Sequence, residues 1–447
     1  MTVIDAPVDA VAGRERDAPN RTSERVWWLS PAWITLVLVP AAVGSAAVFG
    51  DEGFRELWRS PKFVTGNTLL LLLAGGLTVT FGAALVSAGR PVRPRPRRWP
   101  ALTPVERSIL ERASTVTFAL TLVGYAAFLV AGARSGLTLS QLSGAFGQEG
   151  VYDGTIKETL GTIPGVTTLT QVGLVSVVLS ALLIAQRPSR RQWVRLVVVL
   201  LLALPRAFLL TERLALLELI VPLAVVFAMR LSASSVGRRV VGLAPVFALP
   251  FVTVVFALFE YSRSWVFFRM RSNGGFAEFA IERLVGYYAT AINNGALQMA
   301  YNHFPGRWPY ETLAAFWSAP GIGQIELWSL LDGGRVDSAI YLDILTQHAT
   351  PEFNNSSGLA APFTDYGTVG AFVYFLAAGV VMGLIHRAFR ESSPFGILLY
   401  PLLFLGIVEL PRYLNWSQGR VFPALVAAIV IATIVRRRAR ETDGASS

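Results

Sequence analysis

Three short segments hold most of the side chains that could do chemistry. The first, 205–213, reads PRAFLLTER and contains Arg206, Glu212 and Arg213. It lies between two apolar runs, so its charges sit at membrane depth or just above it if those runs cross a bilayer. Ionisable groups at that depth are paired or face a cavity, because an isolated charge there is costly. The segment is either an Arg–Glu pair that locks a helical hairpin or a site in which Arg206 and Arg213 bind substrate.

The second segment, 260–271, reads EYSRSWVFFRMR and contains Glu260, Arg263, Arg269 and Arg271. The planar guanidinium of arginine suits the oxygens of phosphate. Arg269 and Arg271 could instead extend to lipid headgroups. We therefore select Glu260 and Arg263 as substrate-binding candidates, with a diphosphate as the group that the arginine would hold.

The third segment, 348–370, reads HATPEFNNSSGLAAPFTDYGTVG and is rich in groups that exchange protons or donate hydrogen bonds. His348, Glu352 or Asp365 could act as a general base, and the residues alone do not choose among them. The amide of Asn354 could bind a glycan, although a solvated connector would have a similar composition. A fourth, shorter segment, 411–420, contributes Arg412 as a further substrate-binding candidate.

Apolar runs must position these segments. Of the 447 residues, 53% are hydrophobic and only 15% are charged, which is unusual for a soluble domain. A bilayer core of about 30 Å requires roughly 20 apolar residues per helix. Ten runs meet this requirement: 33–49, 66–88, 115–132, 166–186, 193–210, 213–229, 240–259, 366–385, 395–411 and 420–435.

The fold class that follows is an all-α polytopic membrane protein with about ten transmembrane helices. A basic tail that we expect to be disordered (1–32) precedes seven helices (33–260), and a long outer loop (261–365) separates these from three more (366–435) and a second tail (436–447). Within the long loop, 276–300 and 337–347 have the mixed character of short amphipathic helices. Almost all of the polar candidate residues are expected on the same side of the membrane as this loop.

Basic residues set the orientation, because they are retained on the cytoplasmic side of inserted helices. Most of the 39 lysines and arginines lie in the tails and in the loops on the side opposite the long loop, including RPVRPRPRR at 90–98. We therefore place both termini in the cytoplasm of a bacterial cell and the chain in its inner membrane. The net charge of +10 reflects these helix ends beside anionic lipid rather than a nucleic-acid partner.

Several chemistries have no residues to support them. The chain has no cysteine, its three histidines are scattered, and it contains no Walker A sequence. We therefore predict no metal, no cofactor and no bound nucleotide. Any reaction must draw its free energy from the substrate itself.

The stretch PEFNNSSGLAAPFTDYGTVGAFVYFLAAGVVMGLIHRAF resembles the C-terminal part of bacterial O-antigen polymerases, the Wzy-type oligosaccharide repeat-unit polymerases. The resemblance implies a glycosyltransferase of polysaccharide biosynthesis in the cell envelope. Its donor would be an undecaprenyl-diphosphate-linked glycan, and a chain-length regulator would be a further candidate partner. By position, Arg213 corresponds to the family's span-opening arginine, and Arg263 is a second candidate contact to the diphosphate.

Two alternatives belong to other classes. A polyprenyl-phosphate-sugar-dependent glycosyltransferase needs acidic residues in its first outer loop, where Asp51 and Glu52 lie, but 50–65 is short for such a loop. A lipid-linked glycan flippase or transporter needs polar groups at mid-membrane. Only Glu218, in the sixth run, meets that description.

Overall fold

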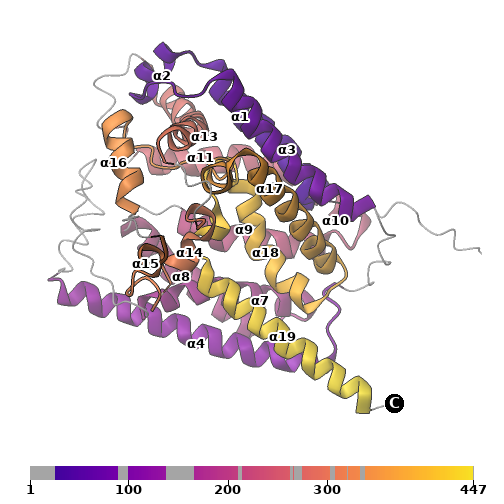
Figure 1. The fold of residues 1–447 in the computed structure, drawn as a ribbon. Coiled ribbons are helices and arrows are strands. Elements are labelled where there is room, and N and C mark those ends of the chain that lie inside the picture. The colour runs from indigo at the N-terminus through magenta and orange to yellow at the C-terminus, as the bar shows by residue number, and fades with distance from the viewer. Residues whose placement is uncertain are drawn as a thin grey trace, which may run out of the picture.

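The structure is a computed structural model, and it describes a chain built of helices and the turns that join them (Figure 1). The described residues are 26–88, 99–136, 166–209, 214–261, 265, 274–302, 308–319, 321–332 and 338–445, and they contain no strand. Most of the expected tail 1–32 and of the loop 133–165 lies outside them. So do five residues singled out above: Glu212, Arg213, Arg263, Arg269 and Arg271.

Five helices in the described residues are long and apolar enough to cross a membrane. A sixth candidate is a pair of helices, α10 (Ser235–Gly242) and α11 (Ala244–Glu260), bent by 44° at their junction. The five are α1 (Pro31–Val48), α3 (Gly66–Ala88), α4 (Pro104–Arg134), α7 (Gly173–Gln186) with the 3-10 turn η2 (Thr167–Val172) before it, and α17 (Ala361–Arg390).

The other expected spans also form helices, but these do not all have the length or the apolar character of a span. They are α8 (Arg190–Leu209), α9 (Leu214–Leu231), α18 (Pro394–Glu409) and α19 (Phe422–Ala445). α18 is apolar but has only 16 residues. The apolar part of α19 ends at Arg436, which leaves it short of a full span.

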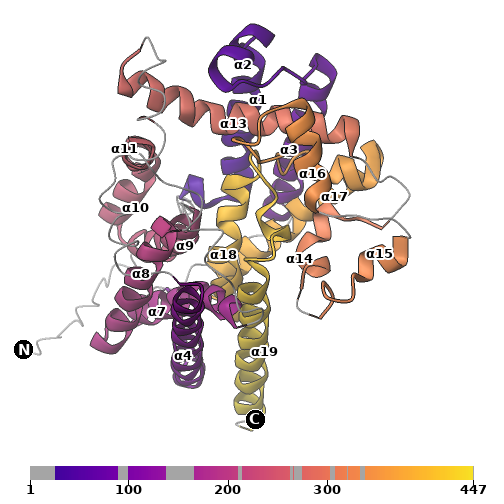
Figure 2. The same cartoon turned by 90° about the vertical axis from the view of Figure 1, so that its left-hand side faces the viewer.

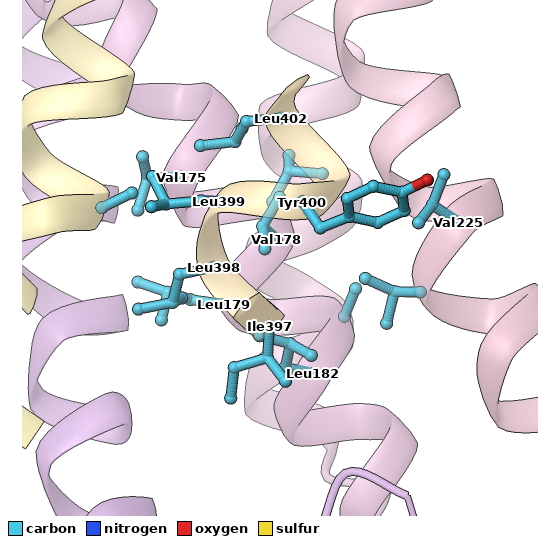
Figure 3. Close-up of a cluster of buried hydrophobic side chains, with 14 of the residues drawn as sticks. Val175, Val178, Leu179, Leu182, Val225, Ile397, Leu398, Leu399, Tyr400 and Leu402 are labelled. Atoms are coloured by element: carbon cyan, nitrogen blue, oxygen red, sulfur yellow. The ribbon is translucent and has the colours of Figure 1, made fainter. Parts of the chain in front are cut away.

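The main core surrounds α7, whose residues from Gly173 to Ala185 are all buried. It packs against α4, α8, α9 and α18. Figure 3 shows Val175, Val178 and Leu182 of α7 facing apolar side chains of α18 and α9. A helix that is apolar on every side suits this central position, because it has no polar face to turn toward water.

A second bundle consists of α1, α3 and α17. Its contact between α3 and α17 is the most extensive in the described structure. Glycines bring the two backbones together: a Cβ on Gly379 would collide with the carbonyl oxygen of Val79, and one on Gly82 with the backbone of Leu376 and Val380. Such close approach between small residues is typical of membrane helices.

α17 is broken near its start. Gly367 has φ 65° and ψ −171°, a conformation that is essentially restricted to glycine. The break separates a short first segment, which carries Asp365, from the long helix that packs on α3. The run expected at 366–385 therefore begins earlier, at Ala361, and contains a turn that hydropathy does not reveal.

The remaining elements lie at one end of the molecule, which we call the loop end (Figures 1 and 2). They are α2 (Asp51–Trp58), α13 (Phe276–Tyr301), η4 (Glu311–Leu313), α14 (Ala314–Trp317), α15 (Leu327–Asp332), α16 (Ser338–His348) and η5 (Asn415–Ser417). α16 matches the expected helix at 337–347. α13 matches the one at 276–300 in extent, and its residues from Ala289 to Gln298 are buried.

α13 can be buried although it carries polar side chains, because these side chains form hydrogen bonds with other segments. Asn293 accepts from the backbone N–H of Phe63 at 2.6 Å and donates to the carbonyl of Pro61 at 2.8 Å. Asn294 donates to the carbonyl of Phe353 at 2.5 Å. Buried amides of this kind hold loops on a helix, because leaving them unpaired would be costly.

The opposite, C-terminal end is closed by indole hydrogen bonds. Near the first element, η1 (Trp27–Leu29), Trp27 and Trp28 donate to the carbonyls of Gly242 and Val241 at 3.2 and 2.7 Å. Trp99 donates to the carbonyl of Phe389 at 2.9 Å. The described arginines of the expected cytoplasmic segments include Arg230, which donates to the carbonyl of Ala185 at 2.8 Å, and Arg436, whose guanidinium lies 6.0 Å from the ring centre of Phe395.

Candidate functional site at the loop end

Three arginine centres lie at the loop end, each assembled from elements that are distant in sequence. In the first, which we call the Arg283 centre, Arg283 of α13 lies between two carboxylates. Its Nη2 is 2.7 Å from Glu352 Oε1, and its Nε is 3.5 Å from Glu260 Oε2. The guanidinium also lies 4.7 Å from the ring centre of Phe353. Glu260 is fully buried, whereas the Glu352 side chain is 33% exposed.

The Arg412 centre is formed where α18 ends. Arg412 Nη1 is 2.9 Å from Oε2 of the buried Glu409, three residues earlier. The guanidinium lies over the rings of Tyr287 and Tyr413, at 5.6 and 5.3 Å from their centres. Burial raises the pKa of the neighbouring Tyr288, so this hydroxyl keeps its proton at neutral pH.

The Arg206 centre borders a cavity. Gln171 lies between two arginine residues: with its amide turned to satisfy both, its oxygen accepts from Arg206 Nη2 at 3.1 Å and its nitrogen donates to the carbonyl of Arg420 at 3.2 Å. Arg420 Nε is 3.8 Å from Glu218 Oε1. Arg206, Gln171, Glu218 and Tyr125 line a narrow pocket here, with room for about one water molecule.

Side-chain contacts place the three centres beside one another in one row, partly through aromatic rings and partly through apolar side chains of α9. Tyr287, under Arg412, packs against Phe353, which lies under Arg283, with ring centres 5.6 Å apart. On the other side, Tyr413 packs against Leu217 and Val221 of α9, the helix that carries Glu218. At the loop end, guanidinium groups, carboxylates and rings therefore lie beside one another on α13, the turn after α18, α9 and α8.

A separate polar group, which we call the Glu311 cluster, forms over the start of α17. Asp365 accepts four hydrogen bonds, from the backbone N–H groups of Tyr310, Glu311 and Thr312 and from the Thr312 hydroxyl, at 2.6 to 3.0 Å. Gln298 of α13 donates to Glu311 Oε1 at 2.7 Å. Burial, together with the neighbouring Asp365 carboxylate, raises the pKa of Glu311 to about 7.

The candidate residues from the sequence thus fall into different places. Glu260 and Glu352 meet at Arg283, while Arg412 and Arg206 belong to neighbouring centres of the same row. Asp365 belongs to the Glu311 cluster. His348 ends α16 and stacks on Tyr301, with ring centres 4.4 Å apart, and Asn354 is exposed. Arg213 and Arg263 lie outside the described residues.

Sequence reasoning missed the partners of these residues. Arg283 and Glu409 were passed over because each lies inside an apolar or amphipathic stretch, and Glu311 because it adjoins an aromatic stretch. A signal did exist for Arg283, since it is the one basic residue in 276–300. A lone basic residue in a predicted helix of a largely apolar chain deserves a search for its counter-ion elsewhere in the fold.

Comparisons with protein-family models, with curated proteins and with solved structures found no match to this chain. The function of this chain must therefore be inferred from the chemistry of the row and of the cluster beside it.

Proposed function

We propose that this chain is a membrane glycosyltransferase that polymerises or ligates undecaprenyl-diphosphate-linked oligosaccharide units on the outer face of the bacterial inner membrane. The proposed topology has ten spans, with both termini in the cytoplasm and the loop end outward. Its support is the separation of the two ends of the molecule. Segments rich in basic residues, which are retained on the cytoplasmic side of inserted helices, meet at the C-terminal end. The arginine centres lie at the other end.

The observation that carries the proposal is the row of three arginine centres. A lipid-linked diphosphate is an anion held at the membrane surface by its own tail. Guanidinium groups suit it because each can give two parallel hydrogen bonds to phosphate oxygens. In this chain such groups come from α8, α13 and the turn after α18, and Arg206 and Glu218 line a narrow pocket between their helices.

Glycosyl transfer from a diphosphate leaves a new negative charge on the departing oxygen. Fixed cations beside that oxygen lower the barrier, because they are already oriented when the charge develops. We assign this role to Arg206 and Arg412. Arg213 and Arg263 remain predicted contacts of the same diphosphate, as the family resemblance implies.

The test is product formation by purified protein in liposomes that contain an undecaprenyl-diphosphate oligosaccharide. We expect longer glycans and free undecaprenyl diphosphate without added metal or nucleotide. Arg206→Gln and Arg412→Gln should each lower the rate by about a hundredfold or more. Arg55→Ala is the matched control, because Arg55 is an exposed arginine of α2 at the same end and, among the described residues, its side chain pairs only with Asp51.

The opposite results are equally clear. Wild-type protein that moves labelled lipid-linked sugar across the bilayer and lengthens no glycan would support a transporter instead. Full activity of both glutamine variants, at equal protein level, would contradict the assignment of the row to the diphosphate.

A further inference from the structure

The Glu311 cluster lies close to the arginine row but contains no arginine among its described members. η4, which begins at Glu311, packs against η5 (Asn415–Ser417). η5 follows Arg412 by three residues, and Asn415 donates to the Tyr413 hydroxyl at 3.1 Å. The carboxyl group of Glu311 is thus carried by an element that touches the turn of the Arg412 centre.

The two carboxylates of the cluster are not equivalent. Both oxygens of Asp365 are occupied by the four donors of residues 310–312. Glu311 makes one side-chain hydrogen bond to a described residue, from Gln298. Asp365 therefore acts as the anchor of the η4 turn, while Glu311 keeps an oxygen available for another donor.

A second observation points to a ligand. Gln298 is 1% exposed, and its Oε1 has no hydrogen-bond partner among the described residues. A buried acceptor without a donor is costly, and this one lies in the same amide that contacts Glu311. The Tyr341 hydroxyl, from α16, is a further polar group near Glu311. Acceptors and hydroxyls without a cation suit a neutral ligand that carries hydroxyl groups.

We propose that Glu311 is the general base of the transfer reaction and that Gln298 and Glu311 together bind the hydroxyl group of the acceptor sugar. This inference rests on the proposed function and names a catalytic residue for it. The hydroxyl would donate to Glu311 while Gln298 Oε1 accepts from a neighbouring hydroxyl.

The chemistry balances without a co-reactant. The acceptor oxygen forms a bond to the anomeric carbon of the donor sugar, and the bond from that carbon to the diphosphate oxygen breaks with its electron pair. The acceptor's proton passes to Glu311 and then to water. A base is most effective when its pKa lies near the working pH, which is the condition that burial and Asp365 create at Glu311.

Groups from each neighbouring element bear on this carboxyl. Asp365 acts on it from α17, Gln298 from α13 and Tyr341 from α16, while the Tyr366 hydroxyl contacts Thr312. Asp365 contributes the repulsion that favours the protonated form of Glu311. Tyr341 stays protonated at neutral pH, since burial raises the pKa of its hydroxyl group.

The experiment measures turnover in liposomes against pH. Wild-type kcat should rise through about pH 7 and then level off. Glu311→Gln should lower kcat about a hundredfold or more, leave donor binding unchanged and remove the pH dependence. Glu311→Ala should regain part of its activity with added formate, which a purely structural role would not permit. Glu326→Gln, at an exposed acid of the same loop region, is the control and should match wild type.

Each failure has a distinct meaning. An active wild-type enzyme with Glu311→Gln at the same rate and the same pH profile overturns Glu311 as the base and leaves the transferase intact. A Glu311→Ala protein that is folded, inactive and insensitive to formate also overturns it. A wild-type protein that forms no glycosidic bond overturns both proposals.

Discussion

At the scale of single residues, Arg283 is the charge whose removal should be most costly. It lies between the fully buried Glu260 and the partly exposed Glu352. Arg283→Met would leave a buried carboxylate without its cation, which costs on the order of 3 kcal/mol. We expect a clear fall in the midpoint of thermal unfolding in detergent, followed by tryptophan fluorescence.

Glu352→Gln provides the comparison at the same centre. Its side chain is one-third exposed, so water can replace part of the lost interaction and the cost should be about 1 kcal/mol or less. Combining Arg283→Met with Glu260→Gln should recover part of the lost stability, because the stranded carboxylate is then neutral. An equal loss in both single variants would argue against the buried pair.

The raised pKa of Glu311 leads to a second prediction, which concerns the stability of the protein rather than its turnover. Its folded-state pKa of about 7 is above the ordinary value of 4.5, so the folded protein binds more protons than the unfolded chain between these values. Stability should therefore be highest below about pH 4.5 as far as this group is concerned, and fall as pH rises through 7. The slope of one such group is at most about 1.4 kcal/mol per pH unit. Glu311→Gln should weaken the pH dependence of the thermal unfolding midpoint between pH 5 and 8.

The residue types were readable from the sequence, but their pairing was not. Arg206, Glu260, Glu352 and Arg412 stand out because charges are rare in so apolar a chain. Their partners depend on contacts that span the fold, such as Arg283 with Glu352 and Gln171 with Arg420. No spacing rule reaches across such separations, since these pairs are created by packing rather than by local periodicity.

At the scale of elements, the contact between α3 and α17 depends on missing side chains. Gly379→Ala should destabilise the protein by about 1–3 kcal/mol, because its new methyl group meets the backbone of Val79. Gly44→Ala, in α1, is the matched control: nothing lies within 4 Å of a Cβ there, and alanine favours the helix. Thermal unfolding of the two variants side by side tests the prediction, and equal midpoints would contradict it.

Hydropathy located these helices well where they are uniform and less well where they are not. The run 66–88 coincides with α3, Gly66–Ala88. The start of α17 was placed five residues late, because the break at Gly367 puts a polar segment before an apolar one. α13 was recognised as a helix, but its burial depends on Asn293 and Asn294 meeting loops from elsewhere in the chain.

At the scale of the whole molecule, the separation of basic segments from the arginine row predicts the topology. Reporter fusions after residues 60 and 300 should read as outside, and a fusion after residue 447 as inside. Phosphatase and fluorescent reporters give opposite signals at each position, so every fusion carries its own control. A fusion after residue 300 that reads as inside would overturn the orientation.

Under the proposed function, the orientation of the C-terminal end, which indole hydrogen bonds hold together, determines which step must come first in the cell. Trp27, Trp28 and Trp99 tie together segments that are more than 200 residues apart in sequence. Under the proposed function, a lipid-linked sugar made on the cytoplasmic leaflet would meet this tied end and not the arginine row. Another protein must therefore invert the substrate before this chain can consume it. On this proposal, loss of the chain would leave finished units on the outer leaflet, each still attached to its polyprenyl carrier.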